Sequence, residues 1–120
     1  MATILLVDDS NTFREELKIN LIGAGHEVLE AVDGEDGLKV ATESKVDMII
    51  SDLNMPKMDG LTMCSHLREQ GITTPIFMLT TQSNPELKAK AANLAIKAWI
   101  VKPPVMAVLI KGIAKVLSST

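Results

Sequence analysis

Five short apolar runs, rich in valine, isoleucine and leucine, recur along the chain, and each ends at polar residues or a turn. They lie at residues 3–7, 27–31, 47–51, 75–79 and 98–101. The first run has none of the polar alternation of a half-exposed strand, so it is typical of a strand buried on both faces. The pattern therefore predicts five short strands, each followed by a polar segment.

The segments between these runs carry apolar residues at helical spacing. Phe13, Leu17 and Leu21 share one face of a first helix, which Gly23 and Gly25 bring to an end. Further helices are expected at residues 38–43, 61–70, 85–93 and 105–117.

Two of these helices carry additional signals. Asn84 precedes Pro85, a favourable helix start in which the amide caps the helix and the proline occupies its first turn. The last helix is expected to carry an apolar stripe made of Val105, Val108, Leu109, Ile113 and Val116.

Strands and helices thus alternate five times along the chain. Right-handed crossovers then give a parallel sheet that is covered on both faces. The expected fold class is α/β, a doubly wound five-stranded parallel sheet with flanking helices, and the compatible topology is the flavodoxin-like strand order 2-1-3-4-5. A chain of 120 residues has the length of one ordinary domain, so we expect residues 1–120 to fold as a unit.

Polar side chains directly follow four of the five apolar runs. In chain order they are Asp8 and Asp9, then Asp52, then Thr80 and Thr81, and last Lys102. Ligands of doubly wound sheets bind outside the carboxyl ends of the strands, where these residues fall. Three carboxylates gathered there would repel one another unless they shared a cation. Oxygen ligands without a nearby histidine or cysteine indicate a hard ion, and a site that also takes a phosphate oxygen favours Mg²⁺ over Ca²⁺.

Lys102 and Thr80 extend this cluster to a set of groups suited to phosphoryl transfer. A carboxylate nucleophile, a divalent ion, a lysine and a hydroxyl are the parts that such chemistry uses, because catalysis consists mainly of positioning and charge neutralisation. No arrangement of serine or cysteine with a histidine competes with it, and His26 and His66 are interpreted as surface or packing residues.

Composition narrows the classes of function further. A formal charge of -3 and only three aromatic residues argue against a nucleic-acid partner, which needs clustered basic side chains and stacking platforms. No apolar run approaches the ~18 residues of a membrane span, and the first residues lack a secretion signal, so a cytoplasmic protein without membrane insertion is expected. Cys64 is the single cysteine, and we expect it to be a core or half-exposed residue.

Four motifs make the whole chain resemble the receiver domains of two-component response regulators. They are Leu-Val-Asp-Asp-Ser at 6–10, Asp-Leu-Asn-Met-Pro-Lys-Met-Asp-Gly at 52–60, Leu-Thr-Thr at 79–81 and Trp-Ile-Val-Lys-Pro at 99–103. The resemblance implies that Asp52 accepts a phosphoryl group from a sensor histidine kinase. It also implies that Asp9, Asp52 and the main-chain carbonyl of Asn54 bind Mg²⁺, with help from Asp8.

The same resemblance implies a switch. Thr80 and Lys102 would contact the phosphoryl oxygens, and Trp99 would change its rotamer as Thr80 moves. The face made by the fourth helix, fifth strand and fifth helix is expected to bind a downstream protein, with the chain as a monomer. An apolar surface patch is expected on this face, including Ile96, Trp99, Met106 and Ile110. The Lys102–Pro103 peptide bond is predicted to be cis.

Among receivers the chain is most similar to the single-domain chemotaxis, CheY-like type, and no output domain is expected after Thr120. Asn54 and Lys-Ala-Trp-Ile-Val-Lys-Pro at 97–103 carry this similarity, whereas Gln82 stands at a position that is often acidic. The first interpretation is therefore a switch that binds a partner, in chemotaxis. It would be no enzyme beyond catalysing its own phosphorylation and dephosphorylation.

Two other functions stay open. One is a phosphorelay carrier that passes the phosphoryl group to a histidine phosphotransfer protein. The other is a phosphatase with an aspartate nucleophile, which is disfavoured because its Asp-x-Asp motif would need a carboxylate at the position of Asn54.

Overall fold

The apolar runs form one parallel sheet with the strand order β2-β1-β3-β4-β5, which confirms the predicted fold class and order. The computed structural model describes residues 2–82 and 84–118. Its strands are β1 (Thr3–Val7), β2 (Glu27–Ala31), β3 (Met48–Asp52), β4 (Ile76–Thr80) and β5 (Ala98–Val101). β3 and β4 lie one residue later than predicted, because Asp52 pairs with Leu79 and Thr80 pairs with Val101 at the end of the sheet.

Among the described residues, four helices join successive strands and a fifth follows β5, as the spacing predicts. They are α1 (Asn11–Gly23), α2 (Gly34–Glu43), α3 (Gly60–Glu69), α4 (Pro85–Asn93) and α5 (Met106–Ser118). α2 begins one turn earlier than predicted because Asp33 caps it, accepting a hydrogen bond of 2.8 Å from the Asp36 N–H. α4 has the predicted bounds, and the Asn84 side chain accepts a hydrogen bond of 2.9 Å from the Leu87 N–H.

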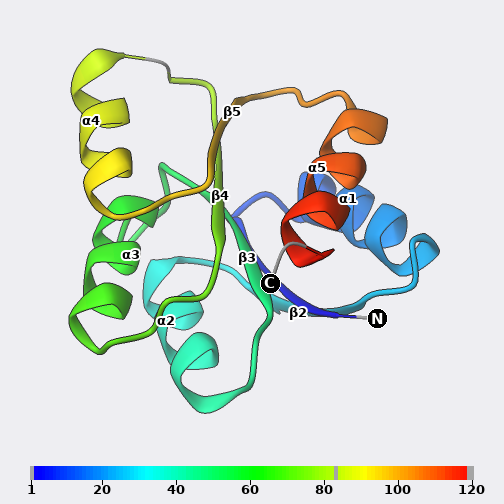
Figure 1. Ribbon diagram of the computed structural model, residues 1–120, viewed down its shortest axis with the longest axis horizontal. Coiled ribbons are helices and arrows are strands. Elements are labelled where there is room, and N and C mark those ends of the chain that lie inside the picture. The colour runs from blue at the N-terminus through cyan, green and yellow to red at the C-terminus, as the bar shows by residue number, and fades with distance from the viewer. Residues whose placement is uncertain (1, 83, 119–120) are drawn as a thin grey trace.

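The helices cover both faces of the sheet. Figure 1 shows α1 and α5 on one side of the strands and α2, α3 and α4 on the other. Successive β1 residues alternate between the two cores, with Ile4 and Leu6 toward α1 and α5, and Leu5 and Val7 toward the other layer. β1 is therefore buried on both faces, as its uninterrupted apolar run predicts.

The predicted stripe of α5 is partly wrong. Leu109 and Ile113 are buried, but Val105 and Val108 have exposed fractions of 68% and 66%. The helix begins only at Met106, and the side that packs on the sheet is made of Met106, Leu109, Ile110, Ile113, Val116 and Leu117. Val105 thus precedes the helix, and Val108 points away from the sheet.

Among the helices of the described residues, none is long and apolar enough to cross a membrane.

Candidate functional site

Three carboxylates meet at the carboxyl end of the sheet. Asp8 and Asp9 follow β1, Asp52 ends the adjacent strand β3, and one ligand oxygen of each lies within 4.8 Å of the others. Asp8 is buried, Asp52 is partly buried and Asp9 is exposed. The predicted clustering of these residues is therefore found in the structure, and its open side is at Asp9.

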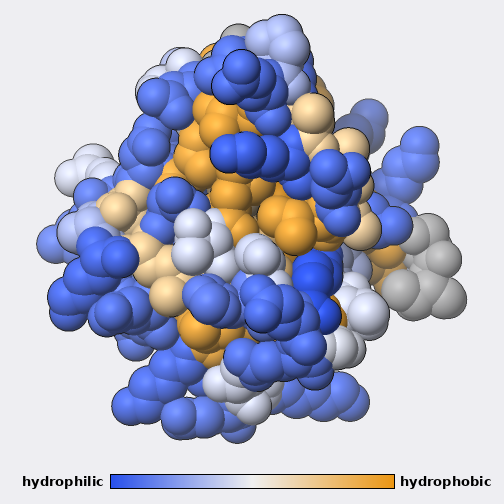
Figure 2. Space-filling model, turned by 90° about the vertical axis from the view of Figure 1, so that its left-hand side faces the viewer, coloured by the Kyte–Doolittle hydropathy of each residue, from blue (hydrophilic) through white to orange (hydrophobic). Residues whose placement is uncertain are grey.

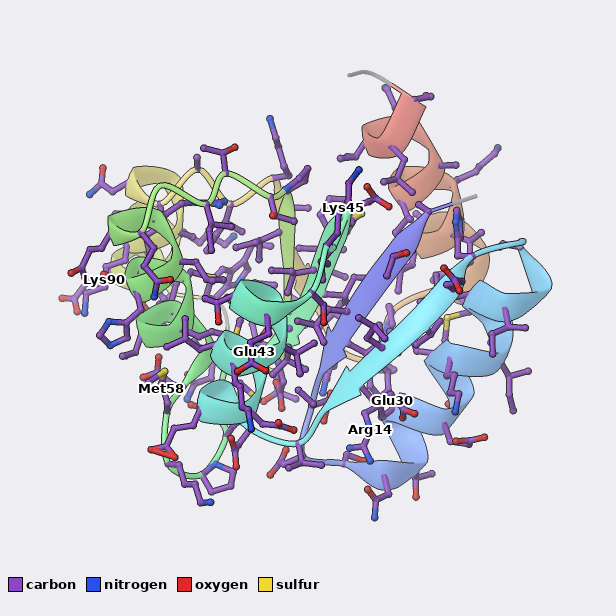
Figure 3. The ribbon with its side chains drawn as sticks, turned by 90° about the horizontal axis from the view of Figure 1, so that it is seen from below. Arg14, Glu30, Glu43, Lys45, Met58 and Lys90 are labelled. Carbon is purple, nitrogen blue, oxygen red and sulfur yellow. The ribbon has the colours of Figure 1, made fainter. Side chains whose placement is uncertain are left out.

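Asp8 is held by neighbours on several sides. Its Oδ1 accepts a hydrogen bond of 2.8 Å from the Ser10 N–H, and its Oδ2 accepts one of 2.8 Å from Lys102 Nζ. The guanidinium of Arg14 donates to the main-chain oxygen of Asp8 at 2.6 Å and to Glu30 at 2.9 Å. Figure 3 shows Arg14 of α1 and Glu30 of β2 side by side. These contacts fix the end of β1 from which the buried carboxylate projects.

Asp52 has one oxygen bound to its own loop and the other facing the lysine. Oδ1 accepts a hydrogen bond of 2.8 Å from the Leu53 N–H, and Oδ2 lies 3.6 Å from Lys102 Nζ. Burial raises the pKa of the Asp52 carboxyl above its usual value, and the negative charges of Asp8 and Asp9 add to this effect. Lys102 opposes the rise in pKa. The surroundings of Asp52 thus disfavour its negative charge, and a bound cation would relieve this cost.

The loop between β3 and α3 passes very close to Asp52. A Cβ atom at Gly60 would collide with the main-chain oxygen of Asp52, and one at Gly34 would collide with the main-chain oxygen of Met58. The Gly60 N–H also donates to the Leu53 oxygen at 2.8 Å. Gly60 therefore has a geometric role, because a residue with a Cβ atom does not fit there, and the same holds for Gly34.

Thr80 is fully buried at the end of β4, next to β5. Its Oγ1 accepts a hydrogen bond of 3.0 Å from the Gln82 N–H, and the Gln82 oxygen accepts one of 3.0 Å from the indole Nε1 of Trp99. A chain of hydrogen bonds thus links Thr80 to the half-buried Trp99 through the main chain of Gln82. Sequence reasoning missed this link because main-chain groups of Gln82 form it.

The predicted apolar patch near β5 is wrong in its membership. Ile96, Trp99, Met106 and Ile110 are all partly buried and pack against the two cores. The large apolar side chains exposed in this part of the chain are Val101, Val105 and Val108, with exposed fractions of 50%, 68% and 66%. The reason is that the sheet and the inner side of α5 take up the bulkier residues.

Other predicted features fall where expected. The Lys102–Pro103 peptide bond is cis. Cys64 is buried in the core, and burial raises the pKa of its thiol to about 12. His26 accepts a hydrogen bond of 3.3 Å from the Ala2 N–H, and His66 is an exposed residue of α3.

A groove of about 530 Å³ lies between α3 and α4, beside the carboxylate cluster. Figure 2 shows this side of the molecule with a hydrophobic centre surrounded by hydrophilic residues. Leu61, Leu87 and Leu94 are among its apolar lining residues, and Asn54 and Gln82 also border it. Asn54 therefore lies in the loop after β3, as predicted, and lines this groove.

Comparisons with known proteins agree with this geometry. A model of the response regulator receiver domain matches residues 4–114. The chain is 40% identical to the chemotaxis protein CheY4 of Vibrio cholerae, with a TM-score of 0.89 over 97% of this chain and 98% of that one. The response regulator TrrA of Thermotoga maritima, solved in complex with Mg²⁺ and BeF, is 30% identical, with a TM-score of 0.86 over 96% of this chain and 98% of TrrA.

Among curated proteins, the chain is similar to the alkaline phosphatase synthesis transcriptional regulatory protein PhoP of Bacillus subtilis. The two are 38% identical over 100 residues, which are 83% of this chain and 42% of PhoP. The chain thus spans less than half the length of that relative.

Proposed function

This chain belongs to the response regulator receiver family, and on that premise we propose that it accepts a phosphoryl group on Asp52 and changes its binding to a protein partner in response. The observation that carries the proposal is the cluster at the end of the sheet. There Asp52 presents Oδ2 to Lys102 at 3.6 Å, beside the carboxylates of Asp8 and Asp9. A sensor histidine kinase is the proposed donor, and residues 1–120 act as one receiver unit.

Each side chain has a defined role in the proposed transfer. The Asp52 carboxylate oxygen forms the new bond to phosphorus while the bond from phosphorus to the donor's histidine nitrogen breaks. Lys102 then moves its hydrogen bond from Asp8 to a phosphoryl oxygen, and the Thr80 hydroxyl donates to another. These groups mainly position the phosphoryl group and neutralise its charge, which is what transfer of this kind requires.

The donor set fits Mg²⁺. One oxygen from each of three carboxylates lies within 4.8 Å of the others, and oxygen is the ligand atom that Mg²⁺ prefers. Lys102 forms ion pairs with two of these carboxylates, those of Asp8 and Asp52. Asp8, Asp9, Asp52 and the main-chain carbonyl of Asn54 would hold the ion. When bound, Mg²⁺ would neutralise the carboxylates and part of the charge on the phosphoryl oxygens.

The hydrogen-bond chain supports a switch. If the Thr80 side chain moves toward a phosphoryl group, the hydrogen bond that its Oγ1 accepts from the Gln82 N–H is lost. The main chain of Gln82 is then free to move, and its carbonyl no longer fixes the Trp99 indole. Moving a population from mostly resting to mostly active requires ~5.5 kcal/mol of differential stabilisation. Charge-assisted hydrogen bonds from Lys102 and Thr80 are the proposed source of that energy.

The proposed partner face is the side made by α4, β5 and α5. Residues 85–118 contain six lysines and a single acid, Glu86, although acids exceed bases in the whole chain. Five of these lysines are exposed, namely Lys88, Lys90, Lys97, Lys111 and Lys115. Together with exposed Val101, Val105 and Val108, they favour a protein partner that presents acidic and apolar side chains.

A chemotaxis role is the finer form of this proposal, supported by the similarity to CheY4. The protein would then act in the cytoplasm as a monomer, with no membrane insertion and no nucleic-acid contact of its own. A phosphorelay carrier is the second candidate, since the same site would serve it.

The test uses a histidine kinase that carries labelled phosphate. We expect the label to move to the wild-type chain and not to Asp52→Asn, and mass spectrometry after acetyl phosphate treatment to place the added group on Asp52. Slow loss of the label supports a switch, whereas rapid passage to a histidine phosphotransfer protein supports a relay. Modification at another residue would contradict the assignment, and steady turnover of a simple phosphate ester would indicate a phosphatase.

A further inference from the structure

We propose that Phe13 is a positioning residue for the phosphoryl site, holding the Lys102 ammonium in place with the face of its ring. The ring centroid lies 4.3 Å from Lys102 Nζ, well within the range of an attractive cation–π contact. The inference rests on the proposed function, in which Lys102 contacts the phosphoryl group.

The contacts of Lys102 leave a defined place for this ring. Nζ donates to Asp8 at 2.8 Å and faces Asp52 at 3.6 Å, and Phe13 occupies a third side at 4.3 Å. Phe13, Asp8 and Asp52 also line the same small cavity at the end of the sheet. The ring is therefore part of the site wall.

The start of α1 sets the place of the Phe13 ring. Ser10 caps the helix, and its Oγ accepts a hydrogen bond of 3.3 Å from the Phe13 N–H. Leu17 and Leu21, which share the predicted helix face, are buried in the core, whereas Phe13 is only partly buried. Phe13, the first residue of this apolar face, thus lies at the edge of the core, where its ring contacts Lys102.

An aromatic ring attracts the Lys102 ammonium without adding a negative charge to the site, which other side chains would not do. A lysine side chain is flexible, and a fourth carboxylate would hold the ammonium but add to the repulsion among the three acids already present. An aliphatic side chain would exclude water but attract no cation. The ring attracts the ammonium without being a strong hydrogen-bond acceptor, so Lys102 remains able to exchange Asp8 for a phosphoryl oxygen while it stays against the ring.

The experiment varies the ring at position 13. Phe13→Leu removes the aromatic face, Phe13→Tyr keeps it, and site-specific incorporation of mono-, di- and trifluorophenylalanine weakens its negative face stepwise at nearly constant shape. The rate of Asp52 phosphorylation by acetyl phosphate with Mg²⁺ is followed by mass spectrometry, and the affinity for beryllofluoride is measured alongside. All comparisons are made where each variant is fully folded.

We expect Phe13→Leu to lower the phosphorylation rate and the beryllofluoride affinity roughly three- to tenfold, the size of one cation–π contact. Phe13→Tyr should retain most of both, and the fluorinated rings should lower both in order of fluorine number. In a Lys102→Met background, Phe13→Leu should have no further effect, because the cation is gone. Equal values for all rings, or the same loss in the Lys102→Met background, would overturn the proposal.

A readout that needs no phosphorylation separates this inference from the proposed function. The Lys102 methylene protons next to Nζ should show an upfield ring-current shift in NMR spectra of the wild type that Phe13→Leu abolishes. If that shift is present but Asp52 is not phosphorylated, the proposed function fails while the ring contact stands. If Asp52 is phosphorylated and the methylene shift is absent, the positioning role of Phe13 is wrong.

Discussion

The ionised Asp52 carboxylate carries an energetic cost to the fold. This carboxylate is partly buried, has two carboxylates nearby and faces one lysine, and burial raises its pKa above the usual 3.8. Because the folded-state pKa is the higher one, the folded protein binds this proton more tightly than the unfolded chain does. The contribution of Asp52 to stability therefore falls as pH rises from 3.8 through the folded-state pKa.

We predict that Asp52→Asn stabilises the metal-free protein at pH 7 by about 1 kcal/mol, the Coulomb energy of one like-charge contact at ~4 Å in water. The gain should shrink as pH falls below the raised pKa, because the wild-type carboxyl then becomes neutral as well. Urea unfolding without divalent ions between pH 4 and pH 7 measures this difference. A less stable variant at pH 7 would show that Lys102 outweighs burial and repulsion.

Trp99 differs from other aromatic residues because its indole N–H donates to the Gln82 oxygen at 3.0 Å. We predict that Trp99→Phe, which keeps a ring but loses the donor, raises the affinity for beryllofluoride about fivefold. The reason is that the resting state alone loses a hydrogen bond worth about 1 kcal/mol. Titration with beryllofluoride in Mg²⁺ tests this. Phe77→Leu is the control, since it removes volume from the core but leaves the hydrogen bond from Trp99 to the Gln82 oxygen intact. An unchanged or lower affinity in Trp99→Phe would remove this bond from the switch.

At the scale of elements, α4 has few buried anchors. Ala91 is the only residue of the helix that is buried among those described. Arg68 of α3 ties the end of α4 to the rest of the layer, donating to the Leu94 oxygen at 2.8 Å and to the oxygens of Ile72 and Thr74 at 2.9 and 3.0 Å. One side chain thus binds the C-terminal cap of α4 and the connection from α3 to β4.

We predict that Arg68→Met lowers the free energy of unfolding by about 2–3 kcal/mol, because three carbonyl groups lose a charged donor. The free energy of unfolding of Arg68→Lys should lie between those of the wild type and Arg68→Met, since an ammonium lacks the planar fork that reaches several acceptors. Chemical unfolding gives the energies, and hydrogen exchange should show faster opening of the last turn of α4 in both variants. Exchange that rises equally in α1 would mean that Arg68 acts on the whole fold and not on α4.

For the whole molecule, we expect the free energy of unfolding to depend on Mg²⁺. A ligand that binds only the folded state adds about 2.7 kcal/mol at a hundredfold excess over its Kd. We predict that Mg²⁺ raises the unfolding midpoint of the wild type, and that Asp9→Ala largely abolishes this rise. Without metal, Asp9→Ala should be as stable as the wild type or slightly more so, because Asp9 is exposed and adds repulsion to the cluster. A clear loss of metal-free stability would mean that Asp9 serves mainly as a structural cap.

Local patterns in the sequence were sufficient for the alternation of strands and helices and for the carboxylate cluster, whereas the strand order is not readable from the pattern alone. β1, β2 and β5 have the predicted bounds, and Asp8 and Asp52 follow or end neighbouring strands. The physical reason is that parallel strands place their carboxyl ends at one edge of the sheet, so the residue after each apolar run has a known location. A buried strand also needs a continuous apolar run, which makes it visible without any knowledge of its neighbours.

Only the tertiary structure decided which distant groups meet. The ring of Phe13 against Lys102, the indole of Trp99 on the Gln82 carbonyl and the Arg68 clamp all join separate elements through side-chain direction or main-chain atoms. The exposure of Val105 and Val108 likewise depends on how α5 turns on the sheet. Residue type and spacing do not predict these orientations, because they are set by the packing of the helices against both faces of the sheet.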